Sequence, residues 1–113
     1  MSSKAVPRKL TGQRISTRFL VGAPALLKWG KQQISGFVEA INLAGMYVIA
    51  SSLPELGEYV DVVLSLPRGG RSFRVRASVV HTLPLSNLRT GFGARFERPP
   101  LGFLEAIKGL AEH

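Results

Sequence analysis

Two neighbouring segments of the chain alternate between apolar and polar side chains, and this pattern restricts the possible folds more than any other feature. In the first segment, Tyr59 to Leu66, the inward candidates are Val60, Val62, Leu64 and Leu66. In the second, Phe73 to Val79, they are Phe73, Val75, Ala77 and Val79. A period of two is typical of a β-strand with one face in a core and the other in water. Between the segments, Pro67-Arg68-Gly69-Gly70 indicates a hairpin turn, so we expect an antiparallel pair.

Four further segments have the composition of short strands. They are Ala25 to Trp29, Ser35 to Ile41 after a polar turn at residues 30–33, Met46 to Ala50, and Arg89 to Phe96. Pro99-Pro100 then ends the sheet, and apolar residues recur at helical spacing at Leu101, Leu104, Ile107 and Ala111. The sequence therefore predicts a mainly β fold, a small barrel of six antiparallel strands closed by one C-terminal α-helix.

The connection Asn42-Leu43-Ala44-Gly45 lies between two of the expected strands. Gly45 is suited to a positive φ or to the close approach of another backbone or a ligand, because it has no Cβ. Asn42 can hydrogen-bond to the local backbone, or present a donor and an acceptor outward. A tight turn accounts for both residues, and a binding site becomes the better interpretation only when the preceding segment is considered.

Positive charge is concentrated near the N-terminus. The chain has 113 residues, the size of one domain, and a net charge of +8. Seven Lys or Arg residues and no acid precede Glu39, whereas the remainder has eight basic and seven acidic residues, a balance of +1. Such a segment favours an anionic partner. Residues 1–13 have little periodicity, and we expect them to form a flexible basic arm ahead of a folded domain at residues 14–113.

The sequence contains few residues that could carry out catalysis or bind a metal ion. The chain has no cysteine, one aspartate (Asp61) and two histidines, His81 on an expected strand and His113 at the end. No carboxylate pair has acid–base spacing and no histidine pair has metal-ligand spacing, so we expect neither an enzyme nor a metal site. No segment has the roughly 20 consecutive apolar residues of a membrane-spanning helix, and we expect a cytoplasmic protein without membrane insertion.

Several motifs in order resemble the PilZ domain, a bacterial six-stranded barrel with a C-terminal helix that acts as a receptor for cyclic di-GMP. The resemblance extends from Arg14 to the end of the chain. The motifs are Arg14-x-x-x-Arg18, Ala40-Ile-Asn42-Leu-Ala-Gly45, Leu64-Ser-Leu66-Pro67, Val79-Val80-His81 and Gly91-Phe-Gly-Ala-Arg-Phe96. Arginine suits a nucleotide site because its planar fork binds phosphate bidentately and its face stacks on a base.

The resemblance implies a set of ligand-binding residues. Arg14 and Arg18 match the family arginines that grip phosphate and guanine, and Gly45 matches the glycine of the second motif. Ala40 stands where the family has Asp or Asn, and Asn42 stands where it has Ser. Because a missing hydrogen bond to a ligand costs about 1–3 kcal/mol, the loss at Ala40 implies an affinity lower by roughly 5- to 150-fold, which Asn42 offsets in part.

Two functions follow from this resemblance. The first is a receptor that binds cyclic di-GMP as an effector through Arg14, Arg18, Asn42 and Gly45, with reduced affinity, and relays it to a protein partner. The alternative is a degenerate PilZ adaptor that binds no nucleotide and acts only through a protein partner, for example in motility regulation. No other cofactor is expected. Nucleic acid is the least favoured partner, because the basic arm has few interleaved aromatic residues.

Two other residues, Tyr47 and Trp29, receive a structural interpretation, and one, Arg95, remains a minor ligand candidate. Tyr47 is assigned to the barrel wall or core, because apolar strand residues usually are. Trp29, at the end of a strand, is interpreted as a packing anchor rather than as a stacking residue. Arg95 is a weaker candidate for a ligand contact.

Overall fold

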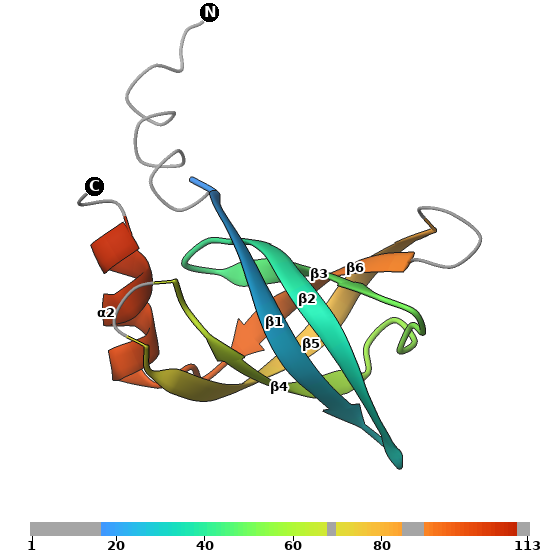
Figure 1. Cartoon of the computed structure of the whole chain (residues 1–113). Helices are drawn as coiled ribbons and strands as arrows, with labels where there is room; N and C mark the ends of the chain where they lie inside the picture. The colour runs from blue at the N-terminus through green and yellow to red at the C-terminus, as the bar shows by residue number, and fades with distance from the viewer. Residues whose placement is uncertain (1–16, 68–69, 85–89, 111–113) are drawn as a thin grey trace, which may run out of the picture.

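The computed structural model describes residues 17–67, 70–84 and 90–110. In these ranges six β-strands precede one α-helix (Figure 1). The elements are β1 (Phe19–Trp29), β2 (Gln32–Ile41), β3 (Gly45–Ala50), β4 (Tyr59–Ser65), β5 (Ser72–Pro84), β6 (Thr90–Glu97) and α2 (Leu101–Leu110). The predicted arm at residues 1–13, with its boundary to the domain, and the predicted ligand residue Arg14 lie outside the described residues.

The six strands form one closed antiparallel barrel in the order β1-β2-β3-β6-β5-β4. Closure depends on β1, which pairs with β2 along most of its length and with β4 through Ala25 to Lys28. A closed barrel leaves no open sheet edge, so strands of ordinary length can satisfy their backbone hydrogen bonds within the domain. The predicted barrel of six antiparallel strands with a C-terminal helix is confirmed.

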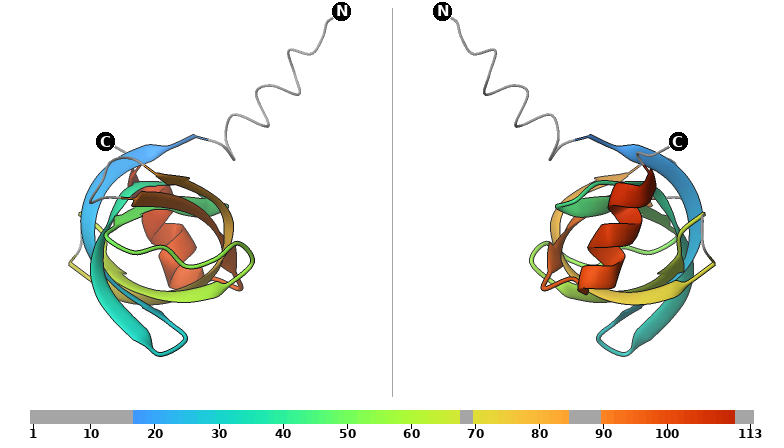
Figure 2. Two further views of the ribbon diagram at one scale, coloured as in Figure 1. Left: turned by 90° about the vertical axis from the view of Figure 1, so that its right-hand side faces the viewer. Right: turned by 90° about the vertical axis from the view of Figure 1, so that its left-hand side faces the viewer.

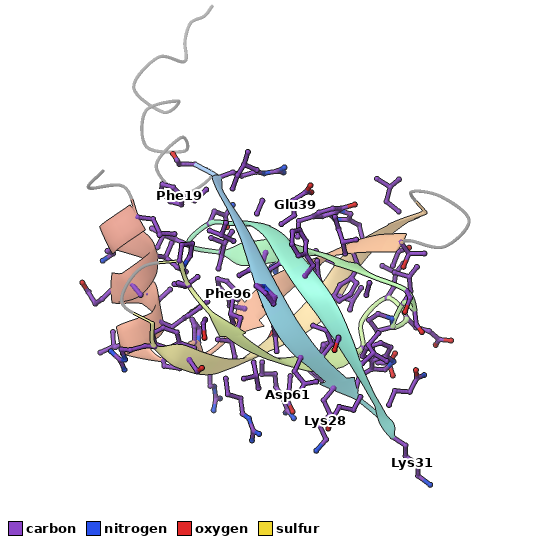
Figure 3. The ribbon with its side chains drawn as sticks, in the orientation of Figure 1. Phe19, Lys28, Lys31, Glu39, Asp61 and Phe96 are labelled. Atoms are coloured by element: carbon purple, nitrogen blue, oxygen red, sulfur yellow. The ribbon has the colours of Figure 1, made fainter. Side chains whose placement is uncertain are left out.

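Helix α2 covers one end of the barrel (Figure 2). It follows Pro99-Pro100 and buries Phe103 and Ile107 completely. The Phe103 ring contacts Phe73 and Phe96 edge to face, with both pairs of centroids 5.2 Å apart, and Figure 3 shows Phe96 in the barrel interior toward the helix. Such aromatic pairs stabilise the junction beyond their burial alone, by about 0.5–1.5 kcal/mol each.

The first two strands are longer than the sequence predicted. The first begins at Phe19 instead of Ala25. Its early part is hard to recognise in the sequence, because the pairing shifts register between Leu20 and Ala23 and Gly22 has a φ of 54°. A bulge of this kind interrupts the alternation from which a strand is recognised. The polar turn predicted at residues 30–33 was too long, since Gln32 already pairs with Trp29. Trp29 is buried at its strand end, as expected of a packing anchor.

Candidate functional site

A groove opens where the end of β2 and the β2–β3 turn meet strands β5 and β6. Its walls come from six parts of the chain that the barrel brings together. The lining residues are Arg18 before β1, Ala40 and Ile41 of β2, Asn42 and Ala44 of the turn, Gly45, Met46 and Tyr47 of β3, Val80 and His81 of β5, and Gly93, Ala94 and Arg95 of β6. Three of the four predicted ligand residues, Arg18, Asn42 and Gly45, therefore line one groove.

The turn is organised by the side chain of Asn42. Its Oδ1 accepts hydrogen bonds from the backbone N–H groups of Ala44 and Gly45, both at 2.8 Å. The backbone N–H of Asn42 donates to the Gly45 carbonyl at 2.9 Å, and Phe96 N–H donates to the Ala44 carbonyl at 2.9 Å. The expectation that Asn42 bonds to the local backbone is confirmed. Its oxygen is consequently used by the turn, and the amide nitrogen is the group left to face a ligand.

Gly45 is required for close packing rather than for an unusual backbone angle. It pairs with Arg95 of β6, and a Cβ at this position would overlap the carbonyl oxygen of Ala94. Positive φ occurs among the described glycines at Gly22, Gly30, Gly57 and Gly70, and Gly45 is not one of them. Of the two roles expected for Gly45, the close approach is correct and the positive φ is wrong.

The charge of the groove is positive. Arg18 and Arg95 line it, and no carboxylate is among its described lining residues. The three basic residues before Glu39 that the structure describes, Arg18, Lys28 and Lys31, do not form one patch, however. Figure 3 shows Lys28 and Lys31 at the tip of the β1–β2 hairpin, the opposite end of β2 from the turn that begins at Asn42. Of these three residues, Arg18 thus lies at the groove, and Lys28 and Lys31 lie away from it.

Two aromatic side chains on the groove wall were not predicted as site residues. Tyr47 projects from β3 and His81 from β5, with ring centroids 6.2 Å apart and planes inclined by 25°. From the sequence, Tyr47 is expected in the barrel wall or core, and a single histidine on a strand, such as His81, is expected to be structural. A signal was available in Gly91-Phe92-Gly93, because glycines at alternate positions of a strand leave room for large side chains from neighbouring strands.

The groove is too small to enclose a whole dinucleotide. Its space is about 200 Å³, compared with roughly 300–1,000 Å³ for pockets that bury most of a small ligand. It can therefore hold one planar group or one phosphate against the barrel while the rest of a ligand lies outside. The described part of the chain contains no group of three potential metal-ligating side chains. It also contains no helix long and apolar enough to cross a membrane.

Comparison with known families identifies this barrel. The family model described as PilZ domain matches residues 12–112. The chain belongs to the PilZ domain family. This family includes receptors for cyclic di-GMP, and its domains are in general non-enzymatic binding or adaptor modules. No functionally curated protein matches the chain in sequence.

Three solved structures share the fold of this PilZ domain. MotI/DgrA, an inhibitor of motility from Bacillus subtilis, matches with a TM-score of 0.71 and 15% identity over 80% of this chain and 45% of MotI. The PilZ domain of CeSA from a cellulose-synthesizing bacterium matches with a TM-score of 0.63 and 21% identity over 87% of this chain and all of that domain. PlzA of Borreliella burgdorferi, in complex with cyclic di-GMP, matches with a TM-score of 0.59 and 17% identity over 90% of this chain and 43% of PlzA. The chain thus spans less than half the length of MotI and PlzA.

Proposed function

We propose that this PilZ domain binds cyclic di-GMP in the groove and relays its presence to a protein partner. The observation that carries the proposal is the convergence of Arg18 with the Asn42–Gly45 turn on one positively charged surface. The two segments are more than twenty residues apart in sequence, and the family resemblance assigns both to the ligand. Family membership and the cyclic di-GMP in the PlzA structure support the same ligand class. Such a receptor would act in the cytoplasm, without a metal or any cofactor other than its effector.

In the proposed complex the arginines bind the anionic part of the ligand. Arg18 lies at the groove, immediately before β1, and Arg14 is four residues upstream on the same segment. Guanidinium groups form paired, charge-assisted hydrogen bonds with phosphate oxygens. Binding would therefore hold the segment that contains both arginines against the barrel. A ligand that favours this arrangement shifts the population of the domain toward it, and a partner that contacts the same surface detects the shift.

The affinity is proposed to be lower than that of a receptor with the complete second motif. The methyl group of Ala40 cannot accept a hydrogen bond, and the Asn42 oxygen already accepts two from the turn. The same observation favours the second candidate function, an adaptor that binds only a protein partner. Among the described residues, Leu20 on β1 and Leu101 on α2 are the most exposed large apolar side chains, at 84% and 77%, and they are the first positions to test for partner contact.

Titration calorimetry of cyclic di-GMP into the full chain tests the proposal. We expect saturable binding that GTP does not reproduce. Arg18→Ala should weaken cyclic di-GMP binding by roughly 10- to 150-fold, because it removes a hydrogen bond to a charged group. Arg74→Ala is the matched control, because Arg74 is an exposed arginine on β5 outside the groove lining. Equal losses in the two variants, or no heat from the wild type at high ligand concentration, would reject the receptor in favour of the adaptor.

A gain-of-function variant provides an independent test of the second motif. Ala40→Asp places a carboxylate on the groove wall, where it can accept hydrogen bonds from the donor edge of guanine. We expect the dissociation constant for cyclic di-GMP to fall by about fivefold or more. Unchanged affinity in a variant that melts at the wild-type temperature would show that the base does not lie near residue 40.

A further inference from the structure

Each of the two outward-facing glycines of β6 has an aromatic ring directly above it. Phe92 points into the core and is fully buried, so Gly91 and Gly93 face the outer side of the barrel. A Cβ on Gly91 would collide with the hydroxyl end of Tyr47, and a Cβ on Gly93 would collide with the imidazole of His81. The central strand thus has no side chain at these positions, and rings from both neighbouring strands cover its backbone.

The register explains how these rings meet. Tyr47 of β3 pairs with Gly93 of β6, and His81 of β5 pairs with Gly93 from the other side. The ring centroids are 6.2 Å apart and the planes differ by only 25°. Both side chains belong to the wall of the groove that Arg18 and Arg95 also line. The groove therefore combines a pair of nearly parallel rings with two cations.

This composition suits a purine base bound through its face. Stacking of a base on an aromatic side chain contributes substantially to binding and tolerates any base, since every base has a π-face. Recognition through the donor edge of guanine needs an acceptor on the protein, and the described lining of the groove has no carboxylate. Asn42 directs its oxygen to two backbone N–H groups. The side chains of the groove thus supply rings and donors more readily than acceptors.

We propose that Tyr47 and His81 form a stacking platform for one purine base of the bound dinucleotide, and that this platform replaces part of the edge recognition missing at Ala40. The inference rests on the proposed function and assigns two contact residues that lie outside the predicted ligand set of Arg14, Arg18, Asn42 and Gly45. It implies that the site distinguishes weakly between guanine and hypoxanthine, which lacks the 2-amino group.

A purely structural role for the rings predicts different results. Large side chains beside a strand glycine shield its backbone from water and stabilise the sheet. In that case truncation of either ring would lower the melting temperature and leave ligand affinity unchanged in the folded variant. Affinity measured below the melting transition, together with variants that retain a ring, separates the two roles.

The experiment measures cyclic di-GMP affinity by calorimetry for Tyr47→Ala, Tyr47→Phe, His81→Ala and His81→Phe in the full chain. Each alanine variant should bind about 5- to 150-fold more weakly than the wild type. Each phenylalanine variant should remain within about fivefold of it, because the ring is retained. Tyr59→Ala is the control, since Tyr59 is an exposed tyrosine on β4 that does not line the groove.

The same titrations are repeated on the wild type with cyclic di-IMP, which we expect to bind within about fivefold of cyclic di-GMP. Wild-type affinity in both alanine variants would overturn the platform while leaving the receptor intact. Cyclic di-IMP binding that is weaker by more than about a hundredfold would overturn recognition through the face. Failure of the wild type to bind cyclic di-GMP at all would reject the proposed function, and this inference with it.

Discussion

The two sides of the groove are built from different kinds of contact. On the β2–β3 side, the shape depends on backbone atoms: Asn42 is tied to the turn, and Gly45 lies against the carbonyl of Ala94. On the β5–β6 side, the shape depends on side chains that lie over β6, since the atoms above Gly91 and Gly93 belong to Tyr47 of β3 and His81 of β5. Side-chain rings can change rotamer, whereas a paired backbone cannot move without loss of its ladder. The first side should therefore be rigid and the second adaptable.

The largest effect on stability is expected for Gly45→Ala. The added methyl group would meet the Ala94 carbonyl, which belongs to the β3–β6 pair and cannot withdraw. We expect the free energy of unfolding to fall by about 3 kcal/mol, or roughly 15 °C in Tm, measured by thermal and urea denaturation. Gly109→Ala in α2 is the control, because among the described residues no atom outside its own helix lies within 4 Å of the added Cβ, and it should leave Tm unchanged or raised. A Tm for Gly45→Ala equal to that of the control would contradict the steric role.

A smaller loss is expected for Asn42→Ala. The substitution removes the acceptor of two turn N–H groups, one exposed and one partly buried. The free energy of unfolding should decrease by about 1–2 kcal/mol in urea denaturation. Asn42→Asp retains an oxygen at the same place and should remain within about 0.5 kcal/mol of the wild type. If both variants lose the same stability, the turn does not depend on the side-chain oxygen.

The smallest stability effect is expected for Gly93→Ala. The new methyl group would displace the imidazole of His81, a side chain on the outer face that can rotate away. We expect a loss of less than about 1 kcal/mol in the free energy of unfolding, together with weaker cyclic di-GMP binding because one ring leaves the platform. Stability and affinity are measured on the same preparation. A loss as large as that of Gly45→Ala would show that the two sides of the groove are equally rigid.

Much of the candidate site was accessible from local motifs. The spacing of Arg18, Asn42 and Gly45 relates them to one family signature, and the structure brings them to one groove. The contacts of Tyr47 and His81 were not accessible in this way. They depend on which strands flank β6 and on a register shift in β5 between Val79 and His81. Neither the strand order nor the register shift can be predicted from the local sequence of any one strand.

The fold shows the same division. Alternating apolar residues in the segments Tyr59 to Leu66 and Phe73 to Val79 determine which side chains face the core, because the period of two is a property of each strand alone. The closed strand order and the early start of β1 at Phe19 depend instead on pairing between distant segments. By itself the sequence determined the hairpin, the helix after Pro99-Pro100 and the family signature. Only the tertiary structure decided that Gly45 is needed for contact with Ala94 and that two rings cover β6, because both facts arise from the packing of strands far apart in the chain.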